Sequence, residues 1–131
     1  MNKIFSLILI GVSFINLNYS CNSHNDYALK FDIINKSDSA IYFTLSFSYP
    51  DTSLSSFKSV PNQWQKILAH DGKNETRSAF NINQTTLVFI FDAHTVETTP
   101  WDTIVKHYTV LKRYQLTKSD MGKMNWTITY P

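Results

Sequence analysis

The sequence predicts a mainly β fold: an antiparallel, immunoglobulin-like β-sandwich with two short helices. Three observations predict it. Apolar and polar residues alternate with a period of two in several segments of strand length. Turn-forming residues separate these segments at short intervals. The chain has 131 residues, 43% of them hydrophobic and 15% aromatic, which is enough to pack the core of one domain.

The N-terminal residues have the pattern of an export signal. A basic start at Lys3 precedes the apolar run 4–15, IFSLILIGVSFI. A helix of this length spans only about 18 Å, whereas a bilayer core is about 30 Å thick. The run therefore predicts a signal peptide rather than a membrane span.

Cys21 is the only cysteine and directly follows the small residue Ser20. This junction resembles the lipobox of bacterial lipoproteins, in which a peptidase cleaves before a cysteine that then carries lipid. The resemblance implies a signal peptide over 1–20 and a lipidated N-terminus and tether over 21–27. The alternating segments that follow predict a single β-rich domain over 28–131. The alternative is cleavage by the ordinary signal peptidase, with Cys21 as an incidental thiol. A single cysteine excludes a disulfide within the chain.

The first two strands are expected over 28–35 and 41–49, where aromatic and β-branched residues alternate with polar ones. The turn residues 36–39 between them predict a hairpin. Tyr42 falls on the polar face of the second strand. Pro50 ends this strand, because proline cannot donate to the ladder.

The middle of the chain begins with a Ser-rich surface loop over 53–62. A strand is expected over 64–69, with an antiparallel partner over 75–80 after a turn. The continuous apolar run TTLVFIFD over 85–92 predicts a central strand that is buried on both faces.

Two helices and two strands are expected after this run. The first helix starts at Pro100, with Thr99 as its N-cap. The second starts at Thr117, which forms a capping box with Asp120. The strands are expected over 110–114 and 125–130.

A search for catalytic chemistry finds no strong constellation. No two of the four histidines have the spacing that brings two imidazoles to one metal, and no Gly-rich phosphate loop is present. We therefore predict no enzyme activity, no metal and no cofactor. A small hydrolase is the alternative, and it requires a cleft that joins Asp92, His94 and a serine.

Two aromatic residues are candidates for stacking on a sugar ring: Trp64, and Tyr42 on the polar face of its strand. Lys and Arg exceed Asp and Glu by only two residues, which argues against a nucleic-acid partner.

The strings FIFD (89–92), PWDTI (100–104), LKRY (111–114) and NWTITYP (125–131) carry a resemblance. Together they make the chain similar to small uncharacterised lipoproteins of Bacteroides-type bacteria. The resemblance implies an outer-membrane lipoprotein of the cell envelope, on either membrane face. Exported proteins of such bacteria can be O-glycosylated after aspartate, which marks Ser39 and Thr103 as candidates.

These observations together predict a lipid-anchored envelope protein that is not catalytic and acts through protein or glycan contacts. The alternative within the binding class is a carbohydrate-binding module.

Overall fold

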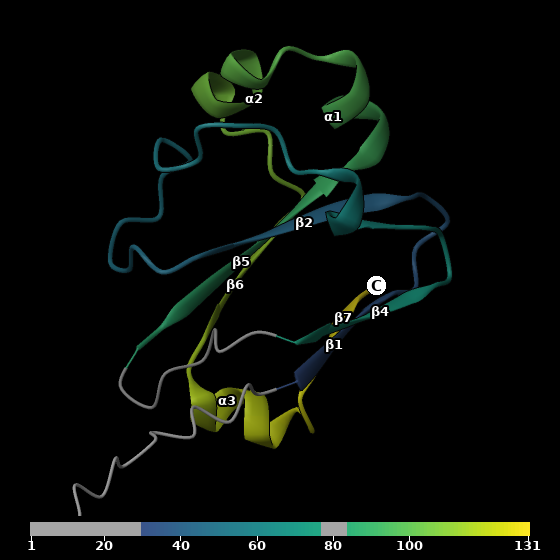
Figure 1. Cartoon of the computed structure of the whole chain (residues 1–131), viewed down its shortest axis with the longest axis vertical. Helices are drawn as coiled ribbons and strands as arrows, with labels where there is room; N and C mark the ends of the chain where they lie inside the picture. Colours follow the sequence, from purple (N-terminus) through teal and green to yellow (C-terminus); the bar gives the residue numbers. More distant parts are fainter. Residues whose placement is uncertain (1–29, 77–83) are drawn as a thin grey trace, which may run out of the picture.

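The computed structural model describes residues 30–76 and 84–131, which form two β-sheets and several short helices (Figure 1). The elements in chain order are β1 (Lys30–Asn35), β2 (Ile41–Ser46), the 3₁₀ helix η1 (Gln63–Gln65), β3 (Lys66–Ile67), β4 (Gly72–Thr76), β5 (Thr86–Asp92), α1 (Ala93–Thr98), α2 (Trp101–His107), β6 (Lys112–Leu116), α3 (Lys118–Lys123) and β7 (Thr127–Tyr130). The expected signal peptide, Cys21 and the tether lie outside the described residues. No helix in the described ranges is long and apolar enough to cross a membrane.

The strands form a four-stranded sheet in the order β3-β2-β5-β6 and a three-stranded sheet in the order β4-β1-β7. All pairs in the larger sheet are antiparallel. In the smaller sheet β1 is antiparallel to β4 but parallel to β7. The prediction of a β-rich, two-sheet fold is confirmed. The prediction that every pair is antiparallel is wrong for β1 and β7, because the chain crosses to the other sheet between them.

One hydrophobic cluster fills the space between the two sheets. It combines side chains of β1 and β7 with side chains of β2, β3 and β5, and Met121 of α3 closes it at one end. Residues at alternate positions supply it, as the period of two requires. Its members include Phe31, Ile33, Phe43, Ile90 and Ile128, which are 0–1% exposed.

A second cluster covers the opposite face of the four-stranded sheet. There α1, α2 and the segment 47–62 pack on β2 and β5 through Leu54, Phe89, Phe91 and Ile104. Figure 1 shows α1 and α2 at one end of the molecule and α3 at the other. Because both faces of this sheet are covered, the residues from Thr86 to Phe91 are all buried. The predicted central strand is confirmed.

The predicted hairpin of the first two strands is wrong. β1 and β2 belong to different sheets, and residues 36–40 cross from one sheet to the other. Asn35 holds this crossing: its side-chain Nδ2 donates to the carbonyl oxygens of Ser39 and Leu68, and its Oδ1 accepts from the backbone N–H and the hydroxyl of Ser37. Each strand therefore places its apolar face against the other sheet instead of lying beside its sequence neighbour.

The middle segment also differs from its prediction. Residues 63–65 form η1, and only Lys66 and Ile67 of the expected strand 64–69 are extended in a ladder. β4 pairs with β1, and not with the segment 64–69. Residues 77–80 of the expected partner strand lie outside the described ranges. Leu54, in the expected surface loop, is buried in the second cluster.

The described residues contain three α-helices, one more than predicted. α1 was not predicted, and it begins where the Asp92 carboxylate accepts a hydrogen bond from the Thr95 N–H. α2 begins at Trp101, with Pro100 as the N-cap and no side-chain capping bond. The capping box of Thr117 and Asp120 at the start of α3 is confirmed. β6 lies two residues later than the strand predicted over 110–114. β7 is two residues shorter than the strand predicted over 125–130, because it begins two residues later.

Candidate functional site

Trp64 is the most exposed large hydrophobic residue of the described chain, with 77% of its surface accessible. It lies in η1, whose first turn is closed by a capping box. The Asn62 side chain accepts from the Trp64 N–H at 3.0 Å, and the Gln65 side chain accepts from the Asn62 N–H at 2.9 Å. Gln65 Nε2 also donates to Thr44 Oγ1 at 3.2 Å, which ties the turn to β2. A firmly held turn therefore presents the indole ring to solvent, as a stacking residue requires.

Tyr42, the second predicted stacking residue, does not fit that role. It is 2% exposed and packs in the cluster beneath α1. Its polar-face prediction failed because α1 and the segment 47–62 cover the face of β2 that the alternation assigns to solvent. The Tyr42 hydroxyl donates to Glu97 Oε1 at 3.1 Å. Burial raises the pKa of the Tyr42 phenol, and the neighbouring Glu97 carboxylate raises it further.

Lys66 and Glu97 form an ion pair next to Tyr42. The Lys66 ammonium donates to the same Oε1 atom of Glu97 and lies 5.8 Å from the centre of the Tyr42 ring. The hydrogen bond to Glu97 raises the pKa of Lys66. The bonds from Lys66 and then Tyr42 lower the pKa of Glu97. The pair thus holds a fixed cation and a fixed anion at the surface of the protein.

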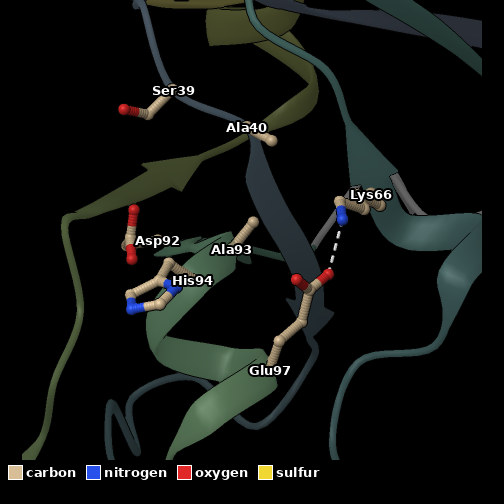
Figure 2. A pocket seen from close by; sticks show the side chains of 7 residues that line it. All are labelled: Ser39, Ala40, Lys66, Asp92, Ala93, His94 and Glu97. Carbon is tan, nitrogen blue, oxygen red and sulfur yellow. Dashed lines mark hydrogen bonds and ion pairs between the residues drawn. The ribbon is translucent and has the colours of Figure 1, made fainter.

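This ion pair forms one wall of a pocket of about 290 Å³ (Figure 2). Asp92 and His94, at the end of β5 and the start of α1, line another part of it. Ser39 belongs to the crossing segment 36–40, and Ala40 and Ala93 add two methyl groups. The pocket therefore draws its residues from three separate parts of the chain, 39–40, 66 and 92–97. Trp64 lies two residues before Lys66.

Sequence reasoning missed Lys66 and Glu97, and no signal in the sequence could have joined them. They are separated by 31 positions, and Glu97 lies on the helix that was not predicted. Asp92 and His94 were singled out, and the pocket does bring them together with a serine.

The arrangement of Ser39, Asp92 and His94 is not a catalytic triad. The Asp92 carboxylate Oδ2 accepts from the Thr95 N–H at 2.7 Å and from the Thr95 hydroxyl at 2.9 Å, so it caps α1. In Figure 2 the Ser39 hydroxyl does not point toward the His94 ring. In a triad the histidine donates to the acid and the serine hydroxyl donates to the histidine, and neither bond is found among the described residues. Nor do the described residues hold a group of three or more metal-ligating side chains.

The two candidate glycosylation residues are both exposed. Ser39 lies at the rim of the pocket, and its backbone carbonyl accepts from the Asn35 side chain at 2.7 Å. Thr103 lies in the first turn of α2, where its N–H donates to the Pro100 carbonyl at 3.0 Å. Their accessibility is compatible with modification, which stays a prediction.

Comparison with known proteins does not place the chain in a family. No protein-family model, no curated protein and no solved structure matches it. The similarity to Bacteroides-type lipoproteins therefore stays a prediction from the sequence strings quoted above.

Proposed function

We propose that this chain is a non-catalytic binding protein of the cell envelope. In this proposal a lipid on Cys21 anchors it to the outer membrane, and the surface around Trp64 contacts a glycan, with a protein contact as the alternative. The single observation that carries the proposal is the exposure of Trp64 on a capped turn. We also propose that the two sheets form an immunoglobulin-like sandwich.

An indole ring that is 77% exposed leaves apolar surface in contact with water in the unbound protein, and its burial by a ligand would be favourable. Here it lies on a turn whose conformation three side-chain hydrogen bonds fix. A turn that is already ordered loses little backbone entropy on binding, which favours a ligand that stacks on the indole face.

A glycan is favoured over a protein because Lys66, two residues after Trp64, lines the pocket described above. The pocket that Lys66 lines is small, and most of its lining residues can form hydrogen bonds. Sugars combine an apolar ring face with a rim of hydroxyl groups, so an aromatic ring and a polar pocket together suit them. A flat protein surface would not use a pocket of this kind.

The position of β1 is compatible with an N-terminal anchor. The Asp32 N–H donates to the Trp126 carbonyl at 2.9 Å, so β1 begins near the end of α3. Figure 1 shows α3 and α1 at opposite ends of the molecule. An anchor attached N-terminal to β1 would join the described domain at the α3 end, which lies opposite α1.

The anchor and the binding surface have separate tests. For the anchor, cells that express the wild-type chain or Cys21→Ser are labelled with an alkyne fatty acid. Labelling that is lost in Cys21→Ser supports lipidation, and equal labelling contradicts it.

For the binding surface, the domain is run through gels that contain envelope or plant polysaccharides. Retardation of the wild type that Trp64→Ala abolishes supports the proposal. Leu68→Ala is the matched control, because Leu68 is also exposed, at 59%, but is aliphatic. No retardation in any polysaccharide would contradict glycan binding, and capture of one envelope protein that depends on Trp64 would favour the protein alternative.

A further inference from the structure

We infer that the pocket between β3, β5 and α1 binds one neutral sugar unit of the glycan that contacts Trp64. This inference rests on the proposed function and names the part of the ligand that the pocket recognises. It depends on the size of the pocket, its apolar floor, its hydrogen-bonding walls and its charge.

The size of the pocket limits the ligand to about one ring. Its volume of about 290 Å³ lies just below the range for small-molecule sites, which begins at about 300 Å³. The pocket is also open to solvent, so a sugar unit inside it can stay joined to the rest of a chain outside.

The floor and the walls differ in polarity. In Figure 2 the methyl groups of Ala40 and Ala93 lie in the middle, with Asp92 and His94 to one side and the Lys66–Glu97 pair to the other. Ala93 is 4% exposed, so the floor is a fixed part of the core. A pyranose ring presents C–H groups on its faces and hydroxyl groups around its edge, which is the same division of apolar and polar surface.

Both walls offer hydrogen-bond acceptors to sugar hydroxyls. Within the described part of the chain, Tyr42 and Lys66 both donate to Oε1 of Glu97, which leaves Oε2 for a ligand. Thr95 uses Oδ2 of Asp92, which leaves Oδ1. Hydrogen bonds to ionised acceptors are the stronger kind. The existing bonds also hold both carboxylates in place before a ligand arrives.

The charge of the pocket selects against acidic sugars. With the His94 imidazole counted as neutral, Asp92, Glu97 and Lys66 give a net formal charge of −1, and the single ammonium already contacts Glu97. A uronic acid would bring a third carboxylate into a pocket that already holds two, and like charges repel. The pocket therefore fits a neutral sugar.

The test is an NMR titration of the ¹⁵N-labelled domain with the methyl glycosides of glucose, mannose and galactose. Titration to about 100 mM detects a Kd of about 10 mM, which is a weak but measurable affinity. We expect at least one glycoside to shift the amide signals of residues 39–40 and 92–97. Methyl glucuronide should bind more weakly than the methyl glycoside of glucose.

Two variants assign the binding to the pocket. Glu97→Gln should weaken binding by about fivefold, because it removes an ionised acceptor. Asp102→Asn is its control, since Asp102 is an exposed carboxylate on α2 outside the pocket, and it should leave the affinity unchanged. Ser39→Trp adds bulk at an exposed position on the rim and should abolish the shifts in a protein whose spectrum shows it folded.

Three outcomes would overturn the inference: no shifts at these amides with any of the glycosides, shifts that Ser39→Trp leaves intact, or glucuronide binding as tight as the neutral sugar. Polysaccharide retardation that depends on Trp64 but not on Glu97 or Ser39 would overturn the pocket inference and leave the proposed function standing. Loss of both kinds of binding would overturn both.

Discussion

The side-chain amide of Asn35 donates a hydrogen bond of 2.7 Å to the backbone carbonyl of Ser39. A second bond of 3.0 Å joins the same amide to the Leu68 carbonyl. Asn35 is fully buried at the end of β1, yet it fixes the crossing segment that carries Ser39 to the rim of the pocket. One buried polar side chain thus connects the fold to the candidate site.

Asn35→Asp should destabilise the domain by more than about 2 kcal/mol. A carboxylate cannot donate to the Ser39 and Leu68 carbonyls. Its own oxygen would instead face these two carbonyl oxygens in a buried site, where all three groups are acceptors. Urea unfolding followed by tryptophan fluorescence measures the change. Asn62→Asp is the matched control, because Asn62 is exposed and aspartate also serves as an N-cap. A loss for Asn35→Asp no larger than for Asn62→Asp would contradict the role of the amide.

This asparagine also explains why the predicted hairpin failed. A period of two shows which residues of a strand share a face, and it correctly placed Phe31 and Phe43 in the core. It does not show which strand pairs with which. The same alternation of buried and exposed residues occurs when two strands are neighbours in one sheet and when they face each other in two sheets. The turn residues 36–39 are compatible both with a hairpin in one sheet and with a crossing between two sheets. The choice depends on tertiary hydrogen bonds such as the one from Asn35 to Leu68, which is 33 positions away.

Phe89→Ala should cost about 3–5 kcal/mol of unfolding free energy. Phe89 is 0% exposed at the middle of β5 and meets the Phe57 ring edge-on, with centroids 5.5 Å apart. Removal of the ring leaves a cavity that the covered sheet has little freedom to close. Because small domains have only about 5–15 kcal/mol of stability, this loss is a large part of the total.

Phe47→Ala gives the comparison for this measurement, since Phe47 is 44% exposed just after β2. We expect it to cost less than about 1 kcal/mol. Equal losses for the two phenylalanines would show that β5 does not form the heart of the core.

Thr117→Ala should destabilise the domain by about 0.5–2 kcal/mol. The Thr117 hydroxyl accepts from the Asp120 N–H at 3.2 Å, and the Asp120 carboxylate accepts from the Thr117 N–H at 2.9 Å. The loss should be small for Thr117→Ser, which keeps the hydroxyl. Ser119→Ala, at an exposed position in the same helix, should change the stability by less than about 0.5 kcal/mol. Thermal unfolding by circular dichroism separates these three results.

The capping box and the pocket show where sequence reasoning ends. The box could be predicted because its two partners lie three residues apart, so the local chain alone decides it. The pocket combines residues 39–40, 66 and 92–97, and only the sheet order brings these together. Tyr42 illustrates the same limit, because its burial is imposed by a helix that starts 51 residues later. Trp64 is 77% exposed, and its stacking on a sugar stays a prediction.

The last prediction concerns the pH dependence of Glu97. Its pKa is lowered from an ordinary value of 4.5 by the hydrogen bonds from Lys66 and Tyr42. A carboxyl group with a lowered pKa in the folded state stabilises the fold at pH values above its unfolded pKa. That contribution is lost as the pH falls through the folded pKa. The pair therefore supports the packing of α1 on the sheet at neutral pH, and this contribution is lost progressively as the pH falls below about 4.5 and through the lower folded pKa.

Tyr42→Phe should raise the pKa of Glu97 toward its ordinary value, because the variant removes one of the two donors and keeps the ring in the core. The value should stay below the ordinary one, since Lys66 still donates to the carboxylate. The shift is measured by ¹³C NMR titration of the glutamate side-chain carboxyl signals. Tyr114→Phe is the matched control: its hydroxyl is also bonded, at 2.8 Å, but to the Thr129 carbonyl on β7. If Tyr42→Phe and Tyr114→Phe both left the Glu97 midpoint where it is in the wild type, the hydrogen bond from Tyr42 would have no part in holding the carboxylate ionised.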